Sequence, residues 1–212
     1  MVNDRYAIVG LPRSMSSSVT ALLRASDIDA THCHYFFNKY TGDLTNRSTK
    51  LFTKKSISTE WVASLVYTRL LADISGEDAD ICLTEEQFQR VLQISKTVVF
   101  PIEIDLNFVK ELSAEIGRWF LYLYSNKELG ILTTEEYRAN PKDSIKKRWG
   151  LEVCEPTQLP GFKHPRPAEY REIFSNYHVI EKFWAKSVRH LAPAEIKPHL
   201  EIVDKEICAT FL

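Results

Sequence analysis

The spacing of apolar residues predicts alternating strands and helices near the start of the chain. Residues 5–10 are a short apolar run that ends at a glycine, a pattern typical of a buried parallel strand. A polar stretch follows at 11–18, and apolar residues then recur at helical spacing over 19–25. Residues 29–37 are a second strand candidate. Strand, polar loop, helix and strand are the parts of a βαβ unit.

A second βαβ unit is predicted in the middle of the chain. Residues 96–102 form a strand, helical spacing follows over 105–116, and Gly117 stands where helices often end. Residues 118–124 are apolar enough for a central strand. Crossovers of this kind are right-handed. We therefore expect a single α/β domain over residues 1–212, with a short parallel sheet of four or five strands flanked by helices on both faces.

Caps and turn residues predict the other elements. Residues 41–57 are rich in Thr, Ser, Asn and Lys and are typical of a loop. Ser58 or Thr59 can cap a helix that runs to about residue 74. The same kinds of signal predict a capping box at 84–87 and a helix over 126–148 that breaks at Pro141. They also predict an extended loop over 153–167, an amphipathic helix over 170–191 and a strand over 200–207.

Composition and charge narrow the class of protein. Of the 212 residues, 44% are hydrophobic and 26% are charged, so disorder of the whole chain is excluded. A formal net charge of −1 gives no global attraction to nucleic acid or to an anionic membrane. No apolar run approaches about 18 residues, so we expect no membrane span. The four cysteines contain no C-x-x-C pair, which favours free thiols in a reducing, cytoplasmic compartment.

The segment from Gly10 to Ser18 is the main candidate for chemistry. It lies between a strand and a helix, where backbone N–H groups and the helix dipole favour an anion. Arg13 adds a cation with planar donors, and four serines add hydroxyls. These serines are Ser14, Ser16, Ser17 and Ser18. The segment is not a Walker A loop, because Met15 and Ser16 replace its second glycine and its lysine. A serine-rich helix cap with a surface arginine is the alternative.

The run Pro12-Arg13-Ser14-Met15-Ser16-Ser17 resembles the 5′-phosphosulfate loop of the sulfotransferase family, P-[KR]-[ST]-G-[ST]-[ST], at five of six positions. The exception is Met15, which stands where the family has a glycine, the residue that tolerates positive φ. The resemblance implies a three-layer, P-loop-like fold and the donor 3′-phosphoadenosine-5′-phosphosulfate (PAPS). It implies that Arg13 holds the phosphosulfate and that Ser16 and Ser17 donate to its oxygens together with backbone N–H groups. It implies no metal.

Two further segments resemble parts of the same family. In the family, an Arg and then a Ser follow a strand and bind the 3′-phosphate; Ser125 and Thr133 stand at the corresponding places, eight positions apart. Thr133 also opens a capping box, so a capping role is the alternative. Lys96 resembles the lysine of a Lys-Thr-His strand in cytosolic members, where the lysine stabilises the leaving oxygen and the histidine removes the acceptor's proton. Here Val98 stands at the histidine position.

The base that would take the acceptor's proton is left open. His32 and His34 are candidates because histidine titrates near neutral pH. Glu103 and Asp105 are the carboxylate candidates. Packing is the alternative role for the histidines, and a helix cap is the alternative role for Asp105. Two histidines on one face of a strand are too few for a zinc site, so we expect no metal.

These residues together predict a sulfotransferase-like protein that transfers a sulfuryl group from PAPS to a hydroxyl or amine. Its expected partners are an adenine nucleotide and a small-molecule or polymer acceptor. No membrane is expected, and nucleic acid stays open as a partner without support in the sequence. The alternatives are a non-catalytic nucleotide- or partner-binding protein on the same fold, and a phosphotransferase or nucleotide hydrolase with a degenerate P-loop. A basic cluster near Trp149 is either a further anion contact or a solvated face. Its members are Lys142, Lys146, Lys147 and Arg148.

Overall fold

The computed structural model describes most of the first 155 residues and one later segment. The described residues are 5–11, 14–34, 46–54, 58–76, 86, 89–90, 93–94, 96–97, 99, 101–155 and 169–182. The chain divides into two compact units. The sheet unit is Met1–Lys55 with Leu121–Phe162, and the helical unit is Ser56–Phe120 with Lys163–Leu212. Each unit combines two separate stretches of the sequence, so neither is delimited by a single linker.

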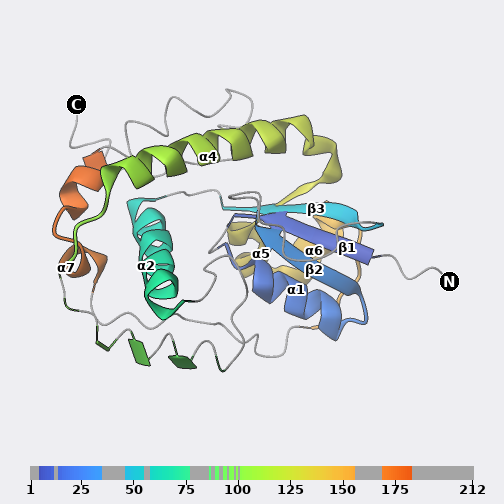
Figure 1. Ribbon diagram of the computed structural model, residues 1–212. Coiled ribbons are helices and arrows are strands. Elements are labelled where there is room, and N and C mark those ends of the chain that lie inside the picture. The colour runs from blue at the N-terminus through green and yellow to red at the C-terminus, as the bar shows by residue number, and fades with distance from the viewer. Residues whose placement is uncertain are drawn as a thin grey trace. The chain divides into compact units, whose positions relative to one another are not determined.

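The sheet unit contains four parallel strands in the order β2-β1-β3-β4 (Figure 1). They are β1 (Arg5–Gly10), β2 (Asp29–His34), β3 (Ser48–Thr53) and β4 (Ile131–Thr133). The chain leaves β1 through α1 (Ser16–Ala25) to reach β2 on one side, while β3 and β4 lie on the other side. The strand order therefore reverses between β1 and β3. Ligands of doubly wound sheets bind at the carboxyl ends of the strands at such a switch point.

Three helices pack on one face of this sheet. They are α1, α5 (Thr134–Ala139) and α6 (Pro141–Trp149). Ile8 and Phe52 of the strands share one buried apolar cluster with Leu22, Tyr137 and Ile145 of the helices. The α/β class, the parallel sheet and the strands expected at 5–10 and 29–37 are thus confirmed, the second strand as far as residue 34, because 35–37 lie outside the described residues. The loop expected over 41–57 is wrong over its middle, where β3 forms.

The second predicted βαβ unit is wrong, because one long helix replaces its helix and its last strand. Helix α4 (Leu106–Ser125) continues through Gly117. Its buried residues recur every three or four positions as Val109, Leu112, Ile116, Trp119 and Leu123. Leu121 is 57% exposed, whereas Trp119 and Leu123, two positions before and after it, are fully buried. A strand would place these three residues on one face, so the pattern excludes a strand. Burial of this stripe outweighs the roughly 1 kcal/mol that a glycine costs inside a helix.

The strand expected over 96–102 is also wrong in its described residues. Lys96 and Thr97 form a turn, and Ile102 makes only an isolated bridge with Phe174. This bridge interrupts the helix expected over 170–191: α7 (Tyr170–Ile173) ends there, and helical turns resume at 177–182. Two backbone hydrogen bonds of 2.8 Å join Ile102 to Ile173 and Ser175. Pairing with Ile102 therefore keeps Phe174 in an extended conformation.

The remaining predicted elements have mixed outcomes. Helix α2 (Thr59–Ser75) is confirmed, and the Oγ of Ser58 accepts a 3.2 Å hydrogen bond from the N–H of Trp61 as its cap. The helix expected over 126–148 is instead a short 3-10 turn η2 (Lys127–Leu129), then β4, α5 and α6, with the break at Pro141 confirmed. The capping box at 84–87 apart from Glu86, most of the loop over 153–167 and the strand over 200–207 lie outside the described residues. Within the described ranges, no helix is both long and apolar enough to cross a membrane.

Candidate functional site

The loop that follows β1 leaves the sheet where β1 and β3 approach closely. Gly10, the last residue of β1, is the register partner of Phe52. A Cβ atom added at Gly10 would lie 2.6 Å from the carbonyl oxygen of Phe52, which is too close for any side chain. Glycine is therefore required at the start of the loop by sterics rather than by flexibility.

Met15 gives this loop a glycine-like backbone. Its φ of 72° and ψ of 20° lie in the left-handed region, and it is the residue that precedes α1. Its carbonyl accepts hydrogen bonds from the N–H groups of Ser18 (3.0 Å) and Val19 (3.2 Å), which close the first turn. A side chain in this region costs about 1–2 kcal/mol. Partial burial of Met15 against the apolar cluster offsets part of this cost.

The start of α1 differs from the starts of α5 and α6. Helix α1 has no side-chain cap and no acidic residue in its first turn. Helix α5 begins with a capping box made by Thr133 and Glu136, and the side chain of Asn140 caps α6. Both of those helices also carry acidic residues in the first turn. The positive end of the α1 dipole is therefore not balanced by a carboxylate in its own first turn.

The serines of the loop have different environments. Ser14 is fully buried, and its Oγ donates to the carbonyl of Leu11 at 2.5 Å. The Oγ of Ser18 lies 3.4 Å from the hydroxyl of Tyr137. Ser16 is buried in the first turn of α1, and Ser17 is partly exposed. Pro12 and Arg13 lie outside the described residues.

Besides Tyr137, helix α5 contacts the loop through Thr134 and Arg138, which no sequence motif singles out. The hydroxyl of Thr134 donates to the carbonyl of Ser14 at 2.8 Å and also lies 3.2 Å from that of Thr53. The Nε of Arg138 lies 3.1 Å from the sulfur of Met15. Arg138 is exposed and has no carboxylate partner within the described part of the chain. These contacts leave no local signal in the sequence, because they join residues 120 and 123 positions apart.

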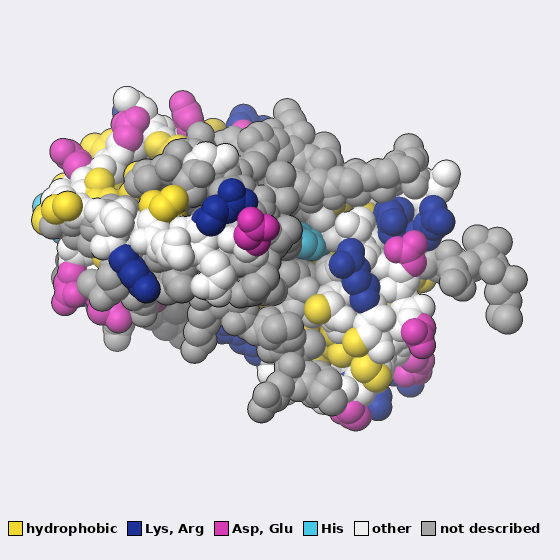
Figure 2. Space-filling model, turned by 60° about the horizontal axis from the view of Figure 1, so that its bottom comes forward, with side chains coloured by type: hydrophobic (Ala, Val, Ile, Leu, Met, Phe, Trp, Pro, Cys, Tyr) yellow, Lys and Arg dark blue, Asp and Glu magenta, His cyan; other side chains and the backbone are white. Residues whose placement is uncertain are grey.

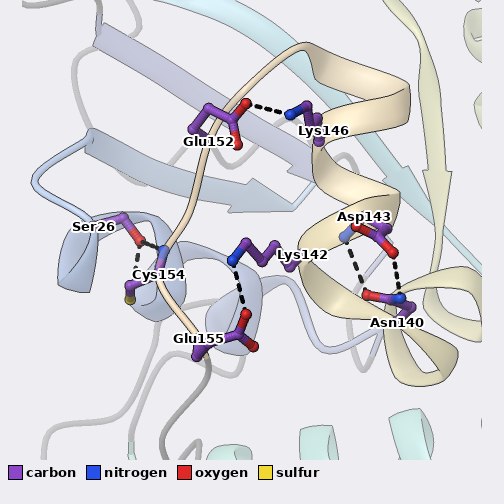
Figure 3. Close-up of polar contacts among 8 residues, drawn as sticks. All are labelled: Ser26, Asn140, Lys142, Asp143, Lys146, Glu152, Cys154 and Glu155. Carbon is purple, nitrogen blue, oxygen red and sulfur yellow. Dashed lines mark hydrogen bonds and ion pairs between the residues drawn. The ribbon is translucent and has the colours of Figure 1, made fainter.

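The basic cluster of α6 is largely paired with carboxylates. Lys142 pairs with Glu155 at 2.7 Å and Lys146 with Glu152 at 2.6 Å (Figure 3). Arg148 pairs with Glu136. Figure 2 shows basic and acidic side chains interspersed on the face that it draws, so attraction of an anion depends on local geometry.

Trp149 is not available for stacking on a purine. It is buried, and its indole N–H donates to the carbonyl of Gly130 at 3.1 Å. The approach of Gly130 to this part of the chain is close, because a Cβ there would lie 2.2 Å from the carbonyl oxygen of Arg148. Trp149 therefore fixes the end of α6 against the turn that precedes β4.

The candidate bases lie in different parts of the molecule. His34 is the last residue of β2 and is the register partner of Gly10, so its backbone lies at the carboxyl edge of the sheet. His32 pairs with Ile8 further down the strand, and burial, with a contribution from nearby Arg24, lowers its pKa. Glu103 is exposed and belongs to the helical unit.

Lys96 and Asp105 also belong to the helical unit. Lys96 is exposed in a turn rather than in a strand, so the structural context that its resemblance implies is wrong. The Oδ1 of Asp105 accepts a 2.9 Å hydrogen bond from the N–H of Asn107 at the start of α4, in agreement with the capping alternative.

The residues expected to bind a 3′-phosphate have other local roles. Ser125 is the exposed last residue of α4 and does not follow a strand. The Oγ1 of Thr133 accepts from the N–H of Glu136 at 3.2 Å and lies 3.0 Å from its carboxylate, so the capping alternative is confirmed. Burial raises the pKa of Glu136, but hydrogen bonds from Arg148 and Thr133 lower it more, so the carboxyl titrates below its ordinary range.

Metal-ligating residues do not gather in the described ranges, where no group of three His, Cys, Asp or Glu residues could hold an ion. Cys33 and Cys154 are free thiols, and burial raises the pKa of Cys33 to about 11.

No family model matches this sequence, and neither a curated protein nor a solved structure matches it.

Proposed function

We propose that the loop between β1 and α1 binds the phosphosulfate or phosphate group of an adenine nucleotide, and that this nucleotide is PAPS. The observation that carries the proposal is the backbone of Met15, which has the left-handed conformation at the position where the sulfotransferase loop has glycine. The methionine therefore leaves the loop in a glycine-like shape. Backbone N–H groups at the start of a helix then converge on an anion.

Charge around the loop supports the same proposal. The first turn of α1 contains no acidic residue, so an anion there would meet the positive end of the helix dipole. The guanidinium of Arg138 lies beside Met15, and the resemblance adds Arg13 as a second cation. The loop also lies at the switch point between β1 and β3, where doubly wound sheets bind nucleotides. These features favour a ligand with at least one phosphate or sulfate.

The proposed chemistry is sulfuryl transfer without a metal. An acceptor oxygen or nitrogen attacks the sulfur of PAPS, and the bond between this sulfur and the bridging oxygen breaks. The products are the sulfated acceptor and 3′,5′-adenosine bisphosphate, and the acceptor's proton passes to a base. His34 is the base candidate whose backbone lies beside Gly10 at the carboxyl edge. Arg13, Arg138 and the loop N–H groups stabilise charge on the leaving oxygen.

Calorimetric titration with 3′,5′-adenosine bisphosphate tests the site, with ATP and magnesium titrated separately to test the phosphotransferase alternative. We expect the bisphosphate to bind, and Arg13→Ala and Arg138→Ala each to weaken its affinity by roughly ten- to hundredfold, the range for a charged hydrogen bond. Lys147→Ala removes an exposed charge from α6 and is the matched control, expected to bind like the wild type. Absence of bisphosphate binding by the wild type would refute the proposal.

Two substitutions at Met15 test the observation that carries the proposal. Met15→Gly keeps the left-handed backbone without its steric cost, so we expect bisphosphate affinity at least equal to that of the wild type. Met15→Val places a β-branched residue in that conformation, which such residues rarely adopt. We expect its affinity for the bisphosphate to fall by about tenfold or more, because the free energy needed to hold the left-handed backbone corresponds to a change of that size. Equal affinities for both variants would show that the loop conformation does not matter for binding.

Nucleotide binding without transfer is the second candidate. It is favoured by Lys96, which the resemblance makes catalytic but which lies in an exposed turn of the helical unit. Incubation of the protein with sulfur-labelled PAPS and phenol or amine acceptors separates the two candidates. Label on an acceptor supports transfer, whereas tight bisphosphate binding without labelled product supports a binding protein.

A further inference from the structure

We infer that Thr134 is a positioning residue for the loop and aims the N–H of Met15 at the anion. Thr134 is almost fully buried at the start of α5. Its hydroxyl donates to the carbonyl of Ser14, on the β1–α1 loop, and lies near the carbonyl of Thr53, at the end of β3. One side chain thus joins the two segments on either side of the switch point. The anion itself belongs to the proposed function, on which this inference rests.

The geometry of the peptide bond explains how this contact acts on the loop. The carbonyl of Ser14 and the N–H of Met15 belong to the same planar peptide unit, and in a trans peptide they point in opposite directions. Because Thr134 holds the Ser14 carbonyl toward α5 at 2.8 Å, the Met15 N–H points away from α5. Without this contact, the peptide unit between these residues can rotate, and the loop loses one oriented donor.

The position of Thr134 is itself fixed by its neighbours. Thr133 and Glu136 form the capping box at the start of α5, and Glu136 also accepts from Arg148 of α6. A hydroxyl in a rigid first turn can hold a loop more effectively than one on a mobile side chain. Thr59 provides a contrast, because its equally buried hydroxyl has no hydrogen-bond partner within the described residues.

Amide hydrogen exchange tests this inference without a ligand. Thr134→Val removes the donor and nearly preserves the shape, and we expect faster exchange at residues 14–18. Thr134→Ser keeps the hydroxyl and should exchange like the wild type. Thr134→Cys supplies a weaker donor, so its exchange rate at residues 14–18 should lie between those of the wild type and the valine variant. It also tests the inference if the valine variant does not fold. Thr59→Val, in the helical unit, is the matched control and should leave the loop unchanged. Unchanged exchange at 14–18 in both the Cys and Val variants overturns the inference.

Affinity for 3′,5′-adenosine bisphosphate provides the second measurement, made where all variants are folded. We expect Thr134→Val to bind about tenfold more weakly, the effect of one hydrogen bond, and Thr134→Ser to restore binding. A purely structural role would lower stability without changing the affinity of the folded protein. If the wild type does not bind the bisphosphate but the valine variant still loosens residues 14–18, the proposed function fails and the positioning role stands. If the wild type binds and the valine variant binds equally well, the positioning role fails.

Discussion

The sheet unit and the helical unit both combine apolar burial with hydrogen bonds between distant segments, but they differ in what their buried threonine hydroxyls contact. In the sheet unit, distant elements are joined by buried polar groups, such as the Thr134 hydroxyl on the Ser14 carbonyl. In the helical unit, α4 buries a continuous apolar stripe, and the buried hydroxyl of Thr59 has no partner among the described residues. Directional hydrogen bonds specify one arrangement of a loop, whereas apolar contacts tolerate repacking. The Thr134 hydroxyl thus favours one arrangement of the proposed anion-binding loop, which lies in the sheet unit.

The largest effect is expected from truncation of the apolar stripe of α4. Trp119→Ala removes a fully buried ring and should lower the free energy of unfolding by about 3–5 kcal/mol. Leu121→Ala alters an exposed residue two positions later and should change it by less than about 0.5 kcal/mol. Urea denaturation followed by circular dichroism measures both. Similar losses at the two positions would indicate a strand, in which residues 119 and 121 share a face.

A smaller effect is expected from two glycines, one in each unit. Gly10→Ala drives a Cβ into the carbonyl of Phe52 and should lower the free energy of unfolding by about 1–3 kcal/mol. Gly76 follows α2 with a φ of +70°, and a Cβ added there would meet no atom within 4 Å, so Gly76→Ala should cost only the conformational strain, about 1 kcal/mol. The same denaturation experiment compares them. An equal or smaller loss for Gly10→Ala would show that β3 can shift away from the loop.

The smallest effect concerns the pH dependence of the sheet unit. Because the pKa of Glu136 is lower in the folded protein, its ionised form stabilises the fold above the unfolded pKa, and this contribution disappears as the pH falls through the folded pKa. Glu136→Gln keeps a capping-box residue but removes the charge. We expect it to cost about 0.5–1 kcal/mol at pH 7, and this cost should shrink as the pH falls below the ordinary range of a glutamate and through the lower folded pKa. Denaturation across this pH range measures it, and a constant difference at every pH would contradict the assigned role of the carboxylate.

The elements that could be predicted from sequence are those whose signals are local. The strand β1 ends at a glycine and the helix α2 begins at a cap, so both are confirmed near their expected bounds. The strand β3 was missed because its first half is polar and only its last three residues are buried. The end of α4 resembles a strand in the sequence because Gly117 is typical of a helix end, although the spacing of buried residues continues through it.

The residues of the candidate site also divide into those with a local signal in the sequence and those without one. The loop from Gly10 to Ser18 is contiguous, so its candidate role as an anion site is visible in the sequence. Thr134 and Arg138 come from a helix more than 100 positions later, and only the fold brings them to the loop. Lys96 has a local signal that the fold does not support, because its resemblance to a catalytic lysine depends on a strand that does not form in the described residues.

The division of the sheet unit into two stretches has a consequence for folding kinetics. Strands β1, β2 and β3 lie within the first stretch of the sheet unit, whereas β4 lies in the second stretch, after residues 56–120 of the helical unit. The contact between Thr53 and Thr134 therefore joins residues 81 positions apart. The entropy of closing such a loop grows only logarithmically with its length, by about 0.6 kcal/mol for each doubling. Long-range pairing slows folding much more than it lowers stability. The interruption of the sheet unit therefore affects chiefly the rate at which β4 and α5 reach the loop between β1 and α1.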